Sequence, residues 1–577
     1  MSVLVERDVA CTTRDGIVLR ADVYRPADDG HYPVLLLRTP YGKGFWPFTH
    51  STLDPVRAAD AGYVVVIQDT RGRWASEGSG FMPYADEFRD GADTVQWAAG
   101  LPYADGSVGI YGLSYMGATA WHAAAEAPPA LRAIAPTQTP NDHFINQMWR
   151  GGALLWGTHL YWSLAVIGPL ELARERAGSP DLPQRFAALV DAVDAFDDLA
   201  RHLPPCELPT AGGLETPFLP YFYDTMRHPT RDEFYRSRSM YERHGEVRVP
   251  ALIVAGWHDV LLAGDLEHFA QMRTQAPTQT AREQTRLVIG PWSHGLFLNV
   301  IGQQEFGLRA SGALIDLKED LTSLHLRWFD RWLKGSADDD GPRVKLFVQG
   351  ANRWRDEDDW PLAHARATPW YLGARGGLGP APPRAARPPR SFLYDPLDPC
   401  PTIGGALLMP RTYASGPVDQ ERLLSRPDVL VYTSETLEDD LEVTGPVSAV
   451  LFAATSARDT DWVVKLCDVH ADGRTFNVCD GILRARFRAG DWTSPTLVEP
   501  EEIIRYEVDL WATSIVFRRG HRLRVLVTSS DFPRYDRNPN TGELGVEARE
   551  TAMARQRVFS DAEHPSHVLL PTVPPNS

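Results

Sequence analysis

Residues 105–125 read Asp105-Gly-Ser-Val-Gly-Ile-Tyr-Gly-Leu-Ser114-Tyr-Met-Gly117-Ala-Thr-Ala-Trp-His-Ala-Ala-Ala125. An apolar run typical of a β-strand ends at Ser114, and an Ala-rich helical pattern begins immediately after it. This order predicts a sharp strand–turn–helix junction that exposes the serine hydroxyl above a sheet, in front of a helix N-terminus. Backbone crosses backbone in such a turn, and Gly112 and Gly117 supply the small residues it needs. Met116 stands where G-x-S-x-G has its second glycine, so partner residues must decide whether the serine is a nucleophile.

Other apolar runs along the chain also end at polar residues that could take part in catalysis. Their alternation with helix-length segments predicts a mostly parallel sheet that is covered by helices on both faces. In such sheets the working residues lie just past the carboxyl ends of the strands, at one edge. The runs are 33–37, 63–67, 251–255 and 286–289, and the polar residues that follow them are Tyr41, Asp69, Asp259 and His294.

The sequence pattern changes twice after the first strands, which predicts three parts of different structure. Residues 141–241 carry aromatic side chains at helical spacing, followed by Ala/Asp/Leu-rich stretches, and predict a helical insertion that caps the sheet. Residues 343–577 alternate short strand-like runs with turns rich in Gly, Asp, Asn and Pro, as in an all-β jelly roll. The remaining residues, 1–140 and 242–342, are assigned to the α/β domain.

The bulk composition is that of a globular protein with 577 residues and a formal net charge of −17. The negative charge argues against nucleic acid or an anionic membrane as a partner. Five scattered cysteines without a C-x-x-C pair predict neither a zinc ribbon nor a disulfide framework. Because the sequence has no run of 18 apolar residues and no signal-peptide pattern, we expect a soluble cytoplasmic protein. The sequence is compatible with a homodimer but does not predict the oligomeric state.

A serine hydroxyl is a weak nucleophile at neutral pH unless a histidine accepts its proton. The histidine in turn needs a carboxylate that fixes its tautomer and stabilises the imidazolium. In the α/β-hydrolase fold these groups occur along the chain in the order serine, acid, histidine. Ser114, Asp259 and His294 follow that order, and each comes directly after a strand-like run. The sequence therefore predicts a catalytic triad of these residues in an α/β-hydrolase domain.

Three other residues compete with the predicted triad. His258 is adjacent to the predicted catalytic aspartate, but neighbouring residues on a strand point to opposite sides, so a structural or rim position is expected. His122 lies about two turns into the Ala-rich helix, where it faces packing or solvent. Asp69 ends its own strand, and the nearby Arg71 and Arg73 offer it a plain ion pair.

Several separated motifs resemble one family of serine hydrolases. In the first half they are Gln68-Asp-Thr-Arg-Gly-Arg73, Gly112-Leu-Ser-Tyr-Met-Gly117, Ala255-Gly-Trp-His-Asp259 and Gly290-Pro-Trp-Ser-His294. In the second half they are Asp459-Thr-Asp461-Trp-Val-Val-Lys-Leu, Asp480-Gly-Ile-Leu-Arg484, Gly520-His-Arg-Leu-Arg524 and Ser529-Ser-Asp-Phe-Pro-Arg-Tyr-Asp-Arg-Asn538. These stretches resemble the cocaine esterase / X-Pro dipeptidyl-peptidase family, which includes α-amino-acid ester hydrolases and acylases. The resemblance runs nearly end to end and is closest to the cocaine esterase branch.

The resemblance implies the same three parts: an α/β-hydrolase domain, a helical cap and a C-terminal jelly roll. It also implies an oxyanion hole formed by the backbone N–H of Tyr115 and the hydroxyl of Tyr41. Two donors must converge on the oxygen that becomes negative, and removing one typically costs about 10²–10³ in turnover. We expect neither a cofactor nor a metal at this site.

Two departures from the family bear on selectivity. The family's α-amino-acid ester hydrolases place further acids after the catalytic aspartate, whereas Val260, Leu261 and Leu262 follow Asp259 here. An α-amino ester is therefore not the expected substrate. In the cocaine esterase branch a phenylalanine beside the acyl group aligns with Leu261. Because leucine replaces it here, recognition of a benzoyl acyl group is not expected to carry over. Leu261, Leu262 and the cap aromatics, of which Trp162 aligns best, predict an apolar acyl pocket.

Three functions are compatible with this sequence. The first is a serine carboxylesterase that acts on a small-molecule ester with an apolar acyl part. The second uses the same triad to cleave amides, as an acylase or an X-Pro dipeptidyl-peptidase. The third is a carbohydrate-binding protein that uses its jelly roll, although an intact triad argues against an inert hydrolase domain. The apolar residues after Asp259 favour the first.

Overall fold

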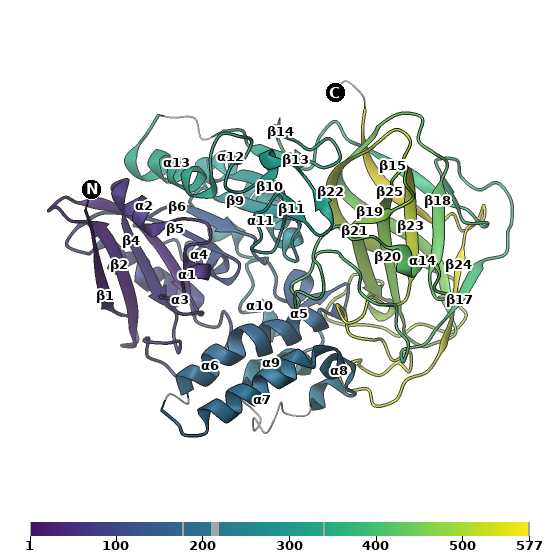
Figure 1. The fold of residues 1–577 in the computed structure, drawn as a ribbon, viewed down its shortest axis with the longest axis horizontal. Helices are drawn as coiled ribbons and strands as arrows, with labels where there is room; N and C mark the ends of the chain where they lie inside the picture. Colours follow the sequence, from purple (N-terminus) through teal and green to yellow (C-terminus); the bar gives the residue numbers. More distant parts are fainter. Residues whose placement is uncertain (1, 176–177, 209–218, 338–340, 575–577) are drawn as a thin grey trace.

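The structure is a computed structural model that describes residues 2–175, 178–208, 219–337 and 341–574. It contains an α/β domain, a group of helices beside it and a strand-rich C-terminal domain (Figure 1). Within these residues, no helix combines the length and the apolar character needed to cross a membrane.

The α/β domain is built on a sheet of ten described strands, parallel from β4 to β13. The predicted runs form its centre, and the two strands expected at the N-terminus form its antiparallel edge. Across the sheet the order is β1 (Val3–Thr12), β2 (Val18–Pro26), β4 (Val64–Asp69), β3 (Tyr32–Thr39), β5 (Ala104–Leu113), β6 (Leu131–Thr137), β9 (Leu252–His258), β10 (Arg286–Ser293), β13 (Val344–Val348) and β14 (Arg353–Glu357).

Helices cover both faces of this sheet, which explains why its central strands are continuously apolar. In β3, Leu35 and Leu37 belong to one core cluster, whereas Val34 and Leu36 belong to the other. The first cluster includes α2 (Pro55–Asp60) and α13 (Leu321–Lys334), and the second includes α3 (Glu87–Ala99), α4 (Tyr115–Ala125), α11 (Leu262–Gln275) and α12 (Gln279–Gln284).

Helix α13 has a capping residue at each end. Asp320 accepts a hydrogen bond from the Ser323 N–H at its N-terminus, and Gly335 ends it in the left-handed conformation with φ 70°. Its Phe329 packs on Gly109 of β5, where an added Cβ would lie 2.5 Å from the ring. The helix therefore packs closely against β5, the strand that leads to Ser114.

The segment between β6 and β9 is largely helical, as predicted, and lies beside both other domains (Figure 1). Most of its aromatic side chains, including Trp149 and Trp156, are buried in the large core cluster. Its described elements are η1 (Phe144–Met148), β7 (Trp149–Arg150), β8 (Ala153–Leu154), α5 (Trp156–Tyr161), η2 (Trp162–Ile167), α6 (Gly168–Glu175), α7 (Leu182–Asp194), α8 (Phe196–Arg201), η3 (Pro205–Glu207), α9 (Pro220–Arg227), α10 (Glu233–Arg236) and η5 (His244–Glu246).

The C-terminal domain consists mostly of antiparallel strands, as expected for a jelly roll. Along its main path the order is β17 (Arg390–Tyr394), β24 (Ala554–Phe559), β19 (Leu441–Thr455), β25 (His567–Val573), β15 (Arg366–Leu372), β16 (Gly377–Gly379), β18 (Leu430–Ser434), β23 (Arg522–Thr528), β20 (Asp461–Val469) and β21 (Thr475–Arg484), and β22 (Ile504–Phe517) pairs with β19.

The domain boundary lies later than the sequence analysis placed it. Strand β13 was assigned to the jelly roll, but it pairs in parallel with β10 of the hydrolase sheet, and β14 pairs with β13. The assignment of residues 343–577 to the jelly roll is therefore wrong at its start, and the hydrolase sheet extends to Glu357. A short alternating strand has the same local pattern in either domain, so only its pairing partner reveals the difference.

Three of the four family-like motifs of the second half, all except Gly520–Arg524, contribute to a buried ionic network. Arg484 pairs with Asp461 and Asp536, each at 2.9 Å, and Arg534 pairs with Asp480 at 2.8 Å. These groups are nearly inaccessible to solvent, and each charge has an opposite partner. Their role is to join the β domain internally and to the cap.

Candidate active site

Ser114 lies at the sharp junction that the sequence predicts between β5 and α4. Its backbone has φ 61° and ψ −124°, a conformation that is strained for a non-glycine residue. A Cβ on Gly117 would lie 2.4 Å from Thr139 Cγ2 and 2.6 Å from the Gly112 carbonyl oxygen. Only glycine fits there, whereas the buried Met116 is accommodated in the core. The tight turn therefore depends on Gly117 and not on a glycine at 116.

The three residues of the predicted triad lie in a continuous chain of hydrogen bonds. The Nε2 atom of His294 is 2.9 Å from Ser114 Oγ, and its Nδ1 is 2.8 Å from Asp259 Oδ2. Asp259 is fully buried, and its other oxygen, Oδ1, accepts the Leu261 N–H at 2.6 Å. Ser114 and His294 keep some solvent exposure. This arrangement can transfer the serine proton to His294 while the buried carboxylate holds the imidazole in one orientation.

Tyr41 is placed as a hydrogen-bond donor near Ser114. Burial raises the pKa of Tyr41 to about 12, and the neighbouring Trp162 and Ser114 side chains are among the groups that lower it. The Trp162 Nε1–H donates to the Tyr41 hydroxyl oxygen at 3.2 Å. Because Tyr41 accepts this bond and stays protonated at neutral pH, its own O–H remains free to donate. It can therefore stabilise an oxygen that becomes negative beside Ser114.

Tyr115 is held rigidly at the first position of α4. Its hydroxyl donates to Glu87 Oε1 at 3.0 Å and accepts the Tyr84 N–H at 3.0 Å, and its ring stacks on Tyr84 with centroids 4.1 Å apart. A backbone N–H at the first helical position has no acceptor within its own helix. The Tyr115 N–H is therefore not engaged within α4, as the predicted oxyanion hole requires.

Aromatic side chains surround the predicted oxyanion tyrosine. The Phe48 ring lies 4.6 Å from that of Tyr41, and Tyr221 lies 5.5 Å from Trp162. Phe81 contacts Tyr221 with centroids 5.9 Å apart. Of this group only Trp162 is predicted from the sequence, because Phe48, Phe81 and Tyr221 come from three separate segments.

The two leucines after Asp259 have different environments. Leu261 is 5% exposed and belongs to a small cluster with its neighbour Val260 and with cap and β-domain residues, which are Ala153, Leu155, Val463, Ile482 and Tyr535. Leu262 begins α11 and packs into the core under the sheet, with 1% exposure. The structure thus brings Trp162 next to Tyr41 and leaves Leu262 in the core.

Sequence reasoning also missed Gln138, which directly follows β6. Its side-chain Nε2 donates to the Ser293 carbonyl at 3.1 Å, and its Oε1 accepts the Gly295 N–H at 2.8 Å. Both bonds are to the immediate neighbours of His294. The rule that working residues follow parallel strands would have found Gln138 if it had been applied to β6.

Comparison with known proteins identifies relatives of this chain along nearly its whole length. Residues 15–296 match the family model of the X-Pro dipeptidyl-peptidase (S15 family), and residues 336–569 match that of the X-Pro dipeptidyl-peptidase C-terminal non-catalytic domain. Cocaine esterase from Rhodococcus sp. (strain MB1 Bresler) is 41% identical, over 99% of this chain and 98% of that protein. The chain belongs to the X-Pro dipeptidyl-peptidase (S15) family. This confirms the resemblance predicted from the sequence motifs.

Two solved structures similar to this S15-family chain have the same overall fold. An α-amino acid ester hydrolase has a TM-score of 0.82 at 26% identity, covering 99% of this chain and 96% of that one. An aminopeptidase from a marine sediment Thaumarchaeota archaeon also has a TM-score of 0.82 at 26% identity, covering 99% and 97%. The predicted α/β-hydrolase domain with a strand-rich C-terminal domain is confirmed.

The competing residues do not join the S15-family site. His258 Nε2 is 2.8 Å from Gln349 Oε1, and burial lowers its pKa to about 4. His122 is buried against the Arg238 carbonyl. Asp69 pairs with Lys43 at 3.2 Å, so the expected pairing with an arginine is wrong. All three have structural partners of their own.

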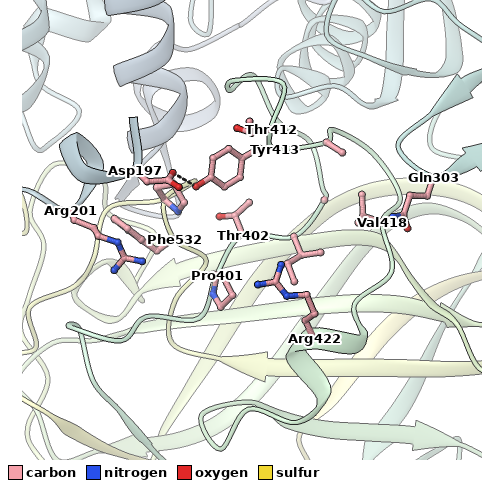
Figure 2. Close-up of a pocket in the computed structure, with 14 residues that line it drawn as sticks. Asp197, Arg201, Gln303, Pro401, Thr402, Thr412, Tyr413, Val418, Arg422 and Phe532 are labelled. Atoms are coloured by element: carbon pink, nitrogen blue, oxygen red, sulfur yellow. Dashed lines mark hydrogen bonds between the residues drawn. The ribbon is translucent and has the colours of Figure 1, made fainter. Parts of the chain in front are cut away.

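A separate hollow of about 490 Å³ lies between the cap and the loops of the β domain (Figure 2). Asp197 and Arg201 of α8 line its cap side, and Asp197 accepts a short hydrogen bond from Tyr413. Thr402 and Arg422 line the opposite side. None of the predicted hydrolytic residues lines it, so this hollow is distinct from the Ser114 site.

Proposed function

We propose that this protein is a serine esterase that hydrolyses carboxylic esters through an acyl-enzyme on Ser114. The observation that carries the proposal is the chain of hydrogen bonds from Ser114 through His294 to Asp259. The 41% identity to a cocaine esterase over nearly the whole chain supports ester cleavage. The protein is a serine hydrolase that acts on esters.

The reaction follows from the contacts of each group. As Ser114 Oγ attacks the ester carbonyl carbon, His294 Nε2 accepts the hydroxyl proton, and the buried Asp259 carboxylate stabilises the imidazolium. The carbonyl oxygen becomes negative, and the Tyr41 O–H and the Tyr115 N–H donate to it. When the tetrahedral intermediate collapses, the alcohol leaves with the proton from His294. Water then repeats these steps on the acyl-enzyme and releases the acid.

The acyl side of the substrate is proposed to be apolar and uncharged. Leu261 follows the catalytic aspartate, and Trp162 lies beside Tyr41 together with the aromatic side chains around it. An ammonium ion buried against such side chains would lack a partner, at a cost of several kcal/mol. The amide-cleaving alternative uses the same triad, and matched ester and anilide substrates separate the two activities.

The experiment that tests the proposal labels the nucleophile. A fluorophosphonate probe should label the wild-type protein and the Ser107→Ala control, which changes a serine of the same strand, but not Ser114→Ala. Replacing Asp259 or His294 should leave the protein folded and lower turnover by several orders of magnitude. Labelling that persists in Ser114→Ala, or a His294→Ala protein with normal esterase activity, would contradict the proposal.

A further inference from the structure

One cluster of metal-ligating side chains lies in the β domain, apart from the triad. Strands β20 and β23 pair antiparallel, with Asp468 opposite Leu523 and Val469 opposite Arg522. This register brings the end of β20 next to the turn before β23. Asp468, His470 and His521 therefore meet at one end of the sheet.

The two imidazoles approach the same carboxylate. His521 Nδ1 lies 2.9 Å from Asp468 Oδ1 and 3.0 Å from its Oδ2, and His470 Nε2 lies 3.4 Å from Oδ2. The two rings stack with centroids 4.5 Å apart. The potential ligand atoms of all three residues lie within 4.8 Å of one another.

We propose that Asp468, His470 and His521 bind a divalent transition-metal ion of the zinc class. Two imidazole nitrogens and one carboxylate oxygen form a ligand set that such ions accept, and the carboxylate supplies a negative charge. Bonds of about 2.0–2.1 Å place tetrahedral ligand atoms about 3.3 Å apart. The observed separations require only small side-chain movements to reach that geometry.

The backbone around the site is already ordered by short turns. The His470 N–H donates to the Arg474 carbonyl at 2.9 Å, and the His521 N–H donates to the Arg518 carbonyl at 2.9 Å. The Leu437 N–H donates to the His521 carbonyl, also at 2.9 Å. The ligands are therefore held near one another before an ion binds.

A hollow next to the three side chains leaves room for a further metal ligand. They line a hollow of about 230 Å³ whose other wall includes Gln304 and Glu305 of the hairpin strand β12 (Gln304–Glu305). Water or a hairpin side chain could complete the coordination from this side. Because the hollow lies between the α/β domain and the β domain, a bound ion should stabilise their contact.

The test uses the full-length protein, first treated with a chelator and then dialysed against Zn²⁺. We expect one zinc per wild-type chain, and at least tenfold weaker binding in the His470→Gln/His521→Gln double variant. Co²⁺ should give a visible d–d absorption band in the wild type that is lost in the double variant. His564→Gln is the matched control, since His564 lies 3.3 Å from Asp561 in the same domain, and no third metal-ligating side chain joins this pair among the residues that the structure describes.

Asp468→Asn keeps the side-chain shape and should also weaken zinc binding, which provides a second variant if the double variant does not fold. Zinc should raise the melting temperature of the wild type and of His564→Gln, but not that of Asp468→Asn. Equal zinc binding by the wild type and the folded ligand variants would overturn the proposal, as would no binding to the wild type. These readouts do not depend on esterase activity.

Discussion

The side-chain amide of Gln138 hydrogen-bonds to the backbone on both sides of His294. Gln138 is fully buried and adopts φ 50°, a conformation uncommon outside glycine. Its Nε2 packs over Gly256, where an added Cβ would lie 2.9 Å from that nitrogen. Since it hydrogen-bonds to Ser293 and Gly295 and not to Ser114 Oγ or His294 Nε2, we propose that Gln138 positions His294, the proposed catalytic histidine.

Gln138→Met keeps the side-chain length and removes both hydrogen bonds. Because small displacements of a catalytic group can cost up to about 10²-fold, kcat on an ester substrate should fall about 10–100-fold, with a smaller change in KM. Gln349→Met is the control, since Gln349 is also a buried glutamine but bonds to the side chain of His258, which lies outside the proposed triad. A lower melting temperature with unchanged kcat would show that Gln138 is only structural.

Tyr41→Phe keeps the ring and removes one donor of the proposed oxyanion hole. Turnover should fall about 10²–10³-fold with little change in the melting temperature. Tyr111→Phe is the control, because Tyr111 is fully buried and its hydroxyl has no hydrogen-bond partner among the described residues. The opposite pattern, preserved turnover with a lower melting temperature, would assign Tyr41 a packing role.

Acyl selectivity tests the apolar environment beside the triad. Each methylene buried by the acyl chain should contribute about 0.8 kcal/mol, so kcat/KM should rise with acyl length until the pocket is full. A free α-amino group should lower kcat/KM because its ammonium ion would be buried without a partner. We therefore expect methyl phenylacetate to be hydrolysed faster than phenylglycine methyl ester. Faster hydrolysis of the phenylglycine ester would require an ammonium-binding group on the cap.

Glu267 on α11 is expected to change charge near neutral pH. Burial, followed by repulsion from Asp142 and Asp509, raises the pKa of Glu267 to about 7. Its Oε2 accepts hydrogen bonds from the side-chain amides of Asn141 and Asn146 at 3.3 and 3.1 Å. Arg231 lowers the pKa, but by less than these causes raise it.

A carboxyl group whose folded-state pKa is raised retains its proton when the unfolded chain has already lost it. Stability should therefore decrease between about pH 4.5 and pH 7 and then level off. Glu267→Gln keeps an acceptor for the asparagines and removes the charge. Its melting temperature should exceed that of the wild type by a few degrees at pH 8 and by less at pH 4.5. Glu283→Gln, which removes the charge of an exposed residue of α12, is the matched control.

Much of the fold and the triad could be predicted from local patterns. The buried strands are continuously apolar because both faces of the sheet are covered, and parallel strands place the residues at their carboxyl ends along one edge. The order of Ser114, Asp259 and His294 therefore predicted their proximity, and the structure joins them through two hydrogen bonds. The glycines around Ser114 likewise follow from the need for a tight turn.

Other features depend on contacts between distant segments, which local patterns do not encode. Strand β13 could pair with either domain, and only its register with β10 places it in the hydrolase sheet. Gln138 and Ser293, which are joined by a hydrogen bond, are 155 positions apart in the chain. Trp162 meets Tyr41 only because the cap folds back over the sheet. Such hydrogen bonds and packing contacts form only between segments that the complete fold brings together. Sequence patterns thus predicted the residues of the proposed triad, whereas the tertiary structure determined which residues hydrogen-bond around them.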